Sequence, residues 1–377
     1  MRPANEAELA EAVRAANGPL RIVGGGTRGI GVASGDALEV AGLSGITLYE
    51  PGALTIVAGA GTPLAEVEAA LAAERQRLAF EVPDLRGLLG RQGASTLGGV
   101  VAANASGPRR VQAGACRDSL IGVRFVDGGG TVVRNGGRVM KNVTGYDLVK
   151  LMAGSHGTLG VLTEVAFKVQ AQPEAEATLV CEGQGRETGI AALCAALGTP
   201  FDVSGAAYLD AAATGAQART QVRVEGLAAS VSYRAGRLRD GVLRGFGIVE
   251  GEASAALWRE VRDVTLFAGR VGAVWRLSVK PTAAAGVVAA IAAAGLAVAA
   301  IHDWGGGLVW LSVQEAVDGG AAVVRAEVAV AGGHATLMRG PAGVAAFPPQ
   351  PDTLARIEAG LRARFDPRGI FNAGLMG

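Results

Sequence analysis

Glycine is the residue that most constrains this chain. It occupies 58 of the 377 positions, about 15% against a usual ~7%. The 58 glycines and 14 prolines together still fall below the ~25–30% that is typical of disordered chains. Half of the residues are hydrophobic, which is enough to bury large cores. The glycines therefore indicate a folded protein with many tight turns and with backbone that lies close to other groups.

Charge, hydropathy and cysteine content exclude several classes of protein. The 35 Lys and Arg residues balance 34 Asp and Glu residues, so the chain lacks the basic excess of a nucleic-acid-binding protein. The longest apolar stretch, 283–300, is mostly Ala and Gly and predicts no membrane span. The first residues contain no apolar signal segment, so we expect a cytoplasmic protein. Cys116, Cys181 and Cys194 have neither zinc nor iron–sulfur spacing, and we expect them to be core residues.

The first 170 residues alternate short strands, helices and glycine turns. Asn5 with Glu8 three positions later is typical of a capping box, so a helix is expected to begin there. Thr62 followed by Pro63 predicts the start of a second helix, with Thr62 as its N-cap. The polar run with a proline at 170–174 indicates a domain boundary.

Beyond this boundary the pattern changes to two successive β-α-β-β-α-β units. We predict an α+β protein with domains at 1–171 and 172–377, the second built on an antiparallel sheet of two ferredoxin-like halves. The predicted strands are 178–181, 203–208, 221–224, 246–249, 273–279, 297–302, 308–313 and 335–338, and the helices are 187–196, 227–238, 253–264, 283–294 and 316–329.

A glycine run after a predicted strand is the first candidate site. The segment 21–29 reads RIVGGGTRG, and its consecutive glycines let several amide N–H groups point into one concavity that binds phosphate. It matches neither the Rossmann fingerprint nor the P-loop pattern. A glycine-rich turn without a ligand is the alternative interpretation.

Two further segments are rich in small residues. The block 93–107 lets a flat ring or a diphosphate approach the backbone, and Ser95 and Thr96 add hydroxyl donors. Its alternative is a small-residue helix that packs closely on a sheet. The third segment is 139–148 followed by 154–164, which ends in a strand whose preceding turn can present backbone groups to a ligand.

In this order, the segments resemble the PCMH-type FAD-binding domain of the vanillyl-alcohol oxidase superfamily. The resemblance runs from about residue 3 to 170, and 53–62 is similar to the family's "lTvtvgAGt" stretch. The segment 364–374 resembles the family's "FDP-x-giFNPG" tail, which implies that the C-terminal tail returns to the FAD-binding domain. The segments 140–147 and 275–281 narrow the resemblance to FAD-binding E subunits of bacterial glycolate oxidase (glycolate dehydrogenase).

The resemblance implies a PCMH-type domain of two α+β subdomains, followed by a cap domain, and FAD as cofactor. Covalent attachment in the superfamily commonly uses a His or Cys near the glycine loop, and none is present there, so we expect non-covalent FAD. The implied contacts are the pyrophosphate on Gly24, Gly25, Gly26 and Thr27, the flavin and ribityl chain near Pro83, Ser95, Thr96, Gly99, Asn104 and Gly107, and the adenine and ribose side at Gly160 and Val161.

A reduced flavin also needs nearby positive charge. Arg109 and Arg110 are candidates, with a solvated arginine pair as the alternative. The family's metal run "H-x-GDGN-x-H" corresponds to 301–308, where only the first histidine is present, so we expect no metal.

Three residues are candidates for catalysis. His302 and His334 are candidate bases, with ordinary structural roles as the alternative. Arg276 is a candidate to bind a substrate carboxylate bidentately, unless it is a salt-bridged strand arginine.

The family resemblance also implies partners. Glycolate oxidase of this kind pairs two related flavoprotein subunits with an iron–sulfur subunit, oxidises glycolate to glyoxylate, and is held at the inner face of the membrane by its partners. A non-catalytic paralogue that binds FAD and scaffolds the complex is one alternative. A stand-alone FAD-dependent oxidase of a sugar or lactone is the other.

Overall fold

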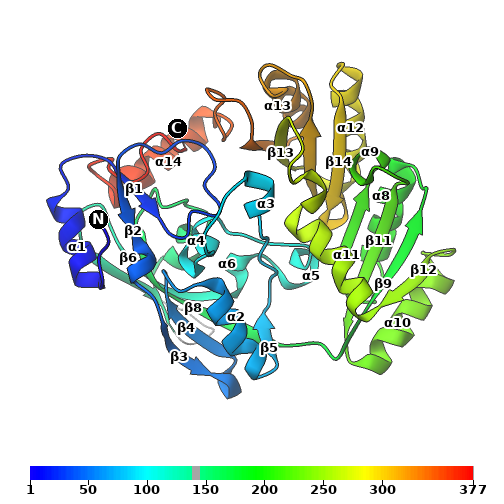
Figure 1. Cartoon of the computed structure of the whole chain (residues 1–377), viewed down its shortest axis with the longest axis horizontal. Coiled ribbons are helices and arrows are strands. Elements are labelled where there is room, and N and C mark those ends of the chain that lie inside the picture. Colours follow the sequence, from blue (N-terminus) through cyan, green and yellow to red (C-terminus); the bar gives the residue numbers. More distant parts are fainter. Residues whose placement is uncertain (138–144, 377) are drawn as a thin grey trace.

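The computed structural model describes residues 1–137 and 145–376 and divides into two lobes (Figure 1). The N-terminal lobe holds β1 to β8, and the C-terminal helix α14 (Asp352–Phe365) returns to pack on it. The second lobe, which we call the cap, holds β9 to β16. Residues 139–144, which begin the third candidate segment, lie outside the described residues. They include most of the 140–147 stretch that narrowed the family resemblance. The predicted α+β class is confirmed.

The N-terminal lobe contains two sheets. A small parallel sheet pairs β1 with β2, and a larger antiparallel sheet has the order β3-β4-β8-β6-β7, with β5 pairing to β8. The strands are β1 (Leu20–Val23), β2 (Asp36–Glu39), β3 (Ile46–Glu50), β4 (Thr55–Gly59), β5 (Gln76–Leu78), β6 (Leu120–Val126), β7 (Val132–Gly136) and β8 (Val161–Ala171).

The first helix begins as predicted and the second begins one residue later than expected. Asn5 accepts a hydrogen bond from the amide of Glu8 at 3.0 Å and caps α1 (Glu6–Ala15). The buried hydroxyl of Thr62 instead accepts from the amide of Gly45 at 2.9 Å, so it is not free to cap α2 (Leu64–Ala73). The other helices here are α3 (Arg86–Leu89), α4 (Leu97–Ala102), α5 (Arg110–Ala113), α6 (Cys116–Ser119) and α7 (Leu148–Met152), with short 3-10 turns η1 (Val40–Gly42) and η2 (Pro51–Ala53).

The cap is one eight-stranded antiparallel sheet of order β12-β9-β11-β10-β14-β15-β13-β16. Each half has the predicted β-α-β-β-α-β order, and the halves join where β10 pairs with β14. The first half comprises β9 (Ala175–Glu182), α8 (Arg186–Leu197), β10 (Val203–Leu209), α9 (Ala211–Thr214), β11 (Arg219–Gly226), α10 (Ala228–Asp240) and β12 (Gly247–Glu250). After α11 (Gly251–Asp263) and η3 (Thr265–Phe267), the second comprises β13 (Ala273–Ser278), η4 (Pro281–Ala283), α12 (Ala284–Ala293), β14 (Val298–Asp303), η5 (Trp304–Gly306), β15 (Leu308–Val313), α13 (Ala321–Val330) and β16 (His334–Arg339).

Helix α13 begins five residues later than the predicted 316. Gly319 and Gly320 both have positive φ, which is incompatible with a right-handed helix. The carboxylate of Asp318 accepts hydrogen bonds from the amides of Gly320 at 2.8 Å and Ala322 at 3.0 Å, and so caps the helix after the turn.

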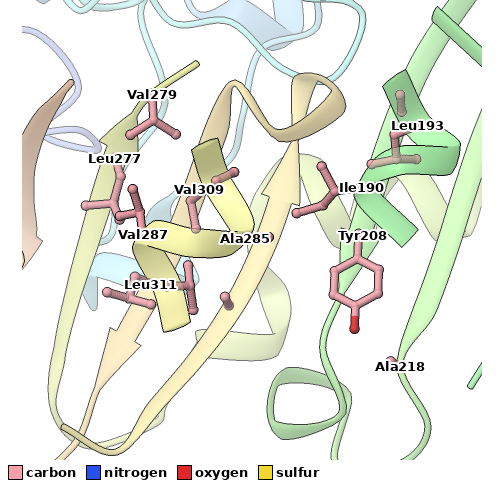
Figure 2. Close-up of a cluster of buried hydrophobic side chains, with 14 of the residues drawn as sticks. Ile190, Leu193, Tyr208, Ala218, Leu277, Val279, Ala285, Val287, Val309 and Leu311 are labelled. Atoms are coloured by element: carbon pink, nitrogen blue, oxygen red, sulfur yellow. The ribbon is translucent and has the colours of Figure 1, made fainter. Parts of the chain in front are cut away.

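The two faces of the cap sheet have different coverings. Helices α8, α10, α12 and α13 cover one face, where Ile190, Tyr208 and Val287 belong to the largest apolar core (Figure 2). On the other face, α11 packs with Leu88 from the N-terminal lobe and Trp310 from the sheet. None of the helices in the described residues has the length and apolar character needed to cross a membrane.

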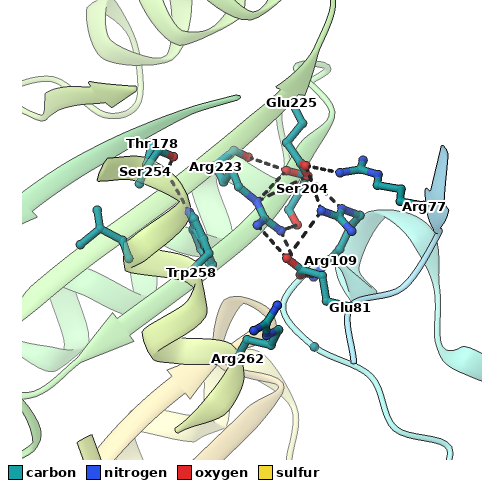
Figure 3. Close-up of polar contacts among 12 residues, drawn as sticks. Arg77, Glu81, Arg109, Thr178, Ser204, Arg223, Glu225, Ser254, Trp258 and Arg262 are labelled. Carbon is teal, nitrogen blue, oxygen red and sulfur yellow. Dashed lines mark hydrogen bonds and ion pairs between the residues drawn. The ribbon is translucent and has the colours of Figure 1, made fainter. Parts of the chain in front are cut away.

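Five charged residues form an ion cluster between the lobes: Arg77, Glu81 and Arg109 from the N-terminal lobe, and Arg223 and Glu225 from the cap (Figure 3). Arg223, only 1% exposed, donates to both carboxylate oxygens of Glu81 at 2.9 and 3.1 Å. Arg109 donates to both oxygens of Glu225 at 3.0 and 2.9 Å. These paired bonds cross the lobe boundary and fix the cap against the N-terminal lobe.

The ion cluster shifts the titration of its own carboxylates. Burial alone would raise the pKa of Glu81, but the charges of Arg223 and Arg109 outweigh it and lower the pKa to about 2. The pKa of Glu225 is also lowered, by Arg223 and Arg109 against the same burial. Both carboxylates are therefore ionised at neutral pH.

Replacing Arg223 by methionine is expected to destabilise the protein strongly. It would leave the buried carboxylate of Glu81 with only part of its countercharge, and breaking a buried pair costs about 3–5 kcal/mol. Urea unfolding followed by circular dichroism measures the change. The matched control is Arg237→Met, at an exposed position of α10, for which we expect a change within about 0.5 kcal/mol. Equal stabilities of the two variants would contradict this role of the ion cluster.

The same cluster predicts an acid-dependent loss of stability. Because the pKa of Glu81 is lower when folded than its ordinary value of 4.5, its contribution is complete above pH 4.5 and is lost as the pH falls toward about 2. Glu81→Gln should flatten the fall in melting temperature over this interval. The exposed Glu11→Gln serves as the control and should keep the wild-type slope.

Candidate functional site

A cavity of about 460 Å³ lies in the N-terminal lobe, within the ~300–1,000 Å³ range of small-molecule sites. The glycine loop after β1, helix α4 and the segment 155–162 form its walls. Among the described residues, no Asp or Glu lines it, whereas Arg21, Arg28 and Arg91 do. The cavity therefore suits an anionic ligand.

The glycine loop packs directly on the second small-residue segment. A Cβ atom built on Gly25 would overlap the carbonyl oxygen of Ala94, and one on Gly24 would overlap the hydroxyl of Thr96. Gly26 has φ +69°, with open space beside it. From residue 25 to 29, no amide N–H donates a hydrogen bond to any described residue. Thr27 is buried and the other four residues are half-buried or exposed, so this run of free donors is open to a ligand and fits a diphosphate.

Helix α4 supplies the opposite wall. Thr96 caps it by accepting from the amide of Gly99 at 3.4 Å, and both residues line the cavity. A Cβ on Gly98 would lie 2.7 Å from the Cβ of Ala60, so the helix also packs tightly on the lobe. The small residues serve both proposed purposes, since they pack closely and leave room beside the backbone.

The C-terminal tail joins the glycine loop to the third segment. The side chain of Asn372 accepts from the amide of Ile22 at 2.8 Å and donates to the carbonyl of His156 at 2.7 Å. The amide of Leu20 donates to the carbonyl of Ile370 at 2.6 Å, which places the tail beside β1. Residues nearly 350 positions apart thus build one cavity wall.

The predicted cofactor residues fall into four places, and all of their cofactor contacts stay predictions. Pro83 and Ser95 contact the guanidinium of Arg28, which donates to the carbonyl of Pro83 at 2.8 Å and to the hydroxyl of Ser95. Asn104 accepts from the amide of Arg117 at 3.1 Å. Gly107 accepts from the indole of Trp304 in the cap, and the flavin contacts of these four residues stay predictions. The residues that line the cavity are Gly24, Gly25, Gly26, Thr27, Thr96, Gly99, Gly160 and Val161.

Arg28 is a site residue that sequence reasoning missed. Burial lowers the pKa of its guanidinium, and its Nε has no hydrogen-bond partner in the part of the chain that the structure describes. The available signal was its place directly after the glycine run. Arg109 was a candidate for the charge near the flavin, but its guanidinium is bound in the ion cluster.

The three catalytic candidates lie in different surroundings. His302 is fully buried, with its ring 5.7 Å from that of Tyr208 on the helix-covered face of the cap sheet, so this position does not support a catalytic role. Burial and the charge of Arg186 lower its pKa to about 3, which keeps it neutral. Arg276 and His334 lie near each other on the opposite face, since the charge of Arg276, after burial, lowers the pKa of His334.

The structure bears on two further expectations, one about an ion pair of Arg276 and one about metal binding. Arg276 forms no salt bridge with any described residue, which corrects the alternative of a salt-bridged strand arginine. No group of three His, Cys, Asp or Glu side chains in the described ranges is arranged to hold a metal ion.

Comparisons with known proteins agree on the type of domain. A family described as "FAD binding domain" matches residues 1–136. The chain is 36% identical over 344 residues to glycolate oxidase subunit GlcE of Escherichia coli, covering 91% of this chain and 87% of the relative. It is 43% identical over 86 residues to glycolate oxidase subunit GlcD of Bacillus subtilis, which covers 23% of this chain and 18% of that subunit.

Solved structures show the same fold at low sequence identity. A 4-ethylphenol oxidase from Gulosibacter chungangensis has a TM-score of 0.76 and 14% identity, covering 100% of this chain and 88% of that one. An alkyldihydroxyacetonephosphate synthase has a TM-score of 0.69 and 16% identity, covering 99% and 76%. These similarities extend over both lobes and concern the fold alone.

Gly25→Ala is expected to weaken FAD binding by about 10–100-fold, because the added methyl group forces the glycine loop off residue 94 and misplaces its amide donors. Fluorescence titration of the apoprotein with FAD measures the change. Gly18→Ala is the matched control, since nothing lies within 4 Å of its new Cβ. Equal affinities for the two variants would contradict this account of the loop.

Proposed function

The chain belongs to the family of glycolate oxidase subunit GlcE, whose members are FAD-dependent oxidoreductases, and from this premise we propose that it is a working redox subunit. In this proposal it oxidises glycolate, or a similar 2-hydroxy acid, to the 2-oxo acid within a complex. The run of free amides beside a cavity without carboxylates is the observation that carries the proposal.

In this proposal, different residues bind different parts of the cofactor. The amides of 25–29 would bind the diphosphate, and Gly160 and Val161 would border the adenine and ribose. Arg28 would provide positive charge beside the flavin, where Pro83 and Ser95 hold its guanidinium. When bound, FAD supplies the two-electron acceptor. We propose non-covalent binding, in which denaturation releases the flavin from the protein.

A partner is needed to carry the electrons onward. Cys116, Cys181 and Cys194 are free, and no group of metal-ligating side chains is found within the described ranges. We therefore propose that an iron–sulfur subunit and a second, related flavoprotein subunit complete the complex in the cytoplasm. Domains at 1–171 and 172–377 are part of the same proposal.

A scaffolding subunit is the second candidate function. The observation that favours it is the position of His302, the single histidine of the 301–308 run, whose imidazole is buried on the far face of the cap sheet. In this alternative the chain binds FAD without oxidising substrate, and its sister subunit performs the chemistry.

Anaerobic mixing of the purified protein with glycolate, followed in the visible spectrum, tests the proposed function. We expect a yellow protein whose flavin band bleaches within the assay, because the substrate electrons pass to the bound FAD. A sugar at the same concentration serves as a substrate control. Precipitation with acid should leave the flavin in solution.

Three results would contradict parts of the proposal. A colourless protein that stays empty after addition of FAD would overturn it entirely. Bleaching only after addition of the partner subunits would support the scaffolding alternative. Rapid reoxidation by oxygen with formation of peroxide, without any partner, would instead indicate a stand-alone oxidase.

A further inference from the structure

Two arginines from different lobes meet at one tryptophan of the cap. The guanidinium of Arg110, in α5, lies 4.5 Å from the centroid of the Trp304 ring, and that of Arg276, in β13, lies 5.4 Å from it. Both arginines are half-buried. The pair therefore spans the boundary between the lobes, as the ion cluster does elsewhere.

Unlike the ion cluster, this pair has no carboxylate. Neither guanidinium takes part in an ion pair or a side-chain hydrogen bond with any residue of the described ranges. Burial, together with the charge of Arg110, lowers the pKa of Arg276 to about 10, so both side chains remain charged at neutral pH. Two like charges held close together and partly desolvated are unfavourable unless an anion joins them.

Trp304, which both guanidiniums approach, is held in place by hydrogen bonds. The indole N–H of Trp304 donates to the carbonyl of Gly107 at 3.0 Å, and the amide of Trp304 donates to the carboxylate of Asp303 at 2.7 Å. Trp304 also has φ +54°, a conformation that a non-glycine residue adopts only where its surroundings enforce it. The two guanidiniums therefore sit on a preorganised surface.

The pair lies near the cofactor cavity, because Gly107, which accepts from the indole of Trp304, follows Ala103 of the cavity lining by four residues. His156 lines that cavity, and the charge of Arg276, after burial, lowers its pKa to about 4. On the cap sheet, Arg276 is opposite Thr336 of β16, and Ser278 is opposite His334. On its other side, Arg276 is opposite the indole of Trp310 in β15. None of these cross-strand neighbours adds negative charge, and the hydroxyl of Thr336 and the imidazole of His334 can hydrogen-bond a small polar molecule.

We propose that Arg110 and Arg276 bind the carboxylate of the small 2-hydroxy acid, each lobe supplying one guanidinium. This inference rests on the proposed function and assigns its substrate site. Guanidinium forks match a carboxylate in shape and charge, and a site built from both lobes forms only when the cap is docked. The hydrogen bond from Trp304 to Gly107, four residues after Ala103 of the cavity lining, brings the bound acid near the cofactor cavity.

Calorimetric titration of the FAD-loaded protein with oxalate, a carboxylate that is not a 2-hydroxy acid, tests the site without turnover. Arg276→Leu should weaken oxalate binding by about 10–100-fold, because a charge-assisted hydrogen bond is lost. Arg276→Lys, which keeps the charge but loses the fork, should give an intermediate affinity. Arg325→Leu is the matched control, because Arg325 lies at the same 5.4 Å from Trp275 but belongs to helix α13.

The outcomes separate this inference from the proposed function. Wild-type protein that holds FAD but does not bind oxalate would overturn the carboxylate site alone. Unchanged oxalate affinity in Arg276→Leu would also overturn it, and a lowered flavin midpoint potential in that variant would then assign the pair to the cofactor. Protein that never takes up FAD would overturn the proposed function, while quenching of tryptophan fluorescence by oxalate would still test the arginine pair.

Discussion

Close contact between two stretches of main chain is the constraint on which the rest of the structure depends. The glycine loop after β1 touches the backbone of residues 94–95 at Gly25 and the side chain of Thr96 at Gly24, so closely that side chains at these two glycines have no room. The main-chain amides of residues 25 to 29 donate no hydrogen bond to any described residue, so they remain available to a ligand. The same absence of side chains that permits the packing creates the binding surface.

Arginines at the boundary between the cap and the N-terminal lobe are paired with carboxylates at one place and lack such partners at another. In the ion cluster, Arg223 and Arg109 each meet a carboxylate with paired hydrogen bonds, which fixes the docking of the lobes. Near Trp304, Arg110 and Arg276 form no ion pair with any carboxylate of the described residues. The first arrangement stabilises the protein by itself, whereas in the proposed site an anion from solution completes the second. In that proposal, docking of the lobes and recognition of the substrate share one interface.

The fold was more predictable from the sequence than the site. Periodicity and turn residues located the two β-α-β-β-α-β units, because strands and helices are decided by local patterns. Helix α13 was placed too early because Ala316 and Val317 extend the apolar pattern, whereas the positive φ values of Gly319 and Gly320 prevent the helix from starting there. The contacts of Arg109, Arg110 and Arg276 could not be predicted from the sequence, because they depend on which residues of the two lobes face each other. Arg28 was missed for a similar reason, because its partners Pro83 and Ser95 lie more than 50 positions away.

Asn372 has a consequence for how this protein can be divided. Its side chain bridges the amide of Ile22 and the carbonyl of His156, so three distant parts of the chain together form the wall of the cavity. A fragment cut after residue 171 would keep every glycine of the loop yet leave both of these main-chain groups without their partner, at a cost of about 1–3 kcal/mol each. The cofactor-binding half is thus not a portable module. A fusion or domain-exchange design therefore has to include the C-terminal tail together with the N-terminal lobe. The flavin content of such a design then reports whether the tail has docked on that lobe.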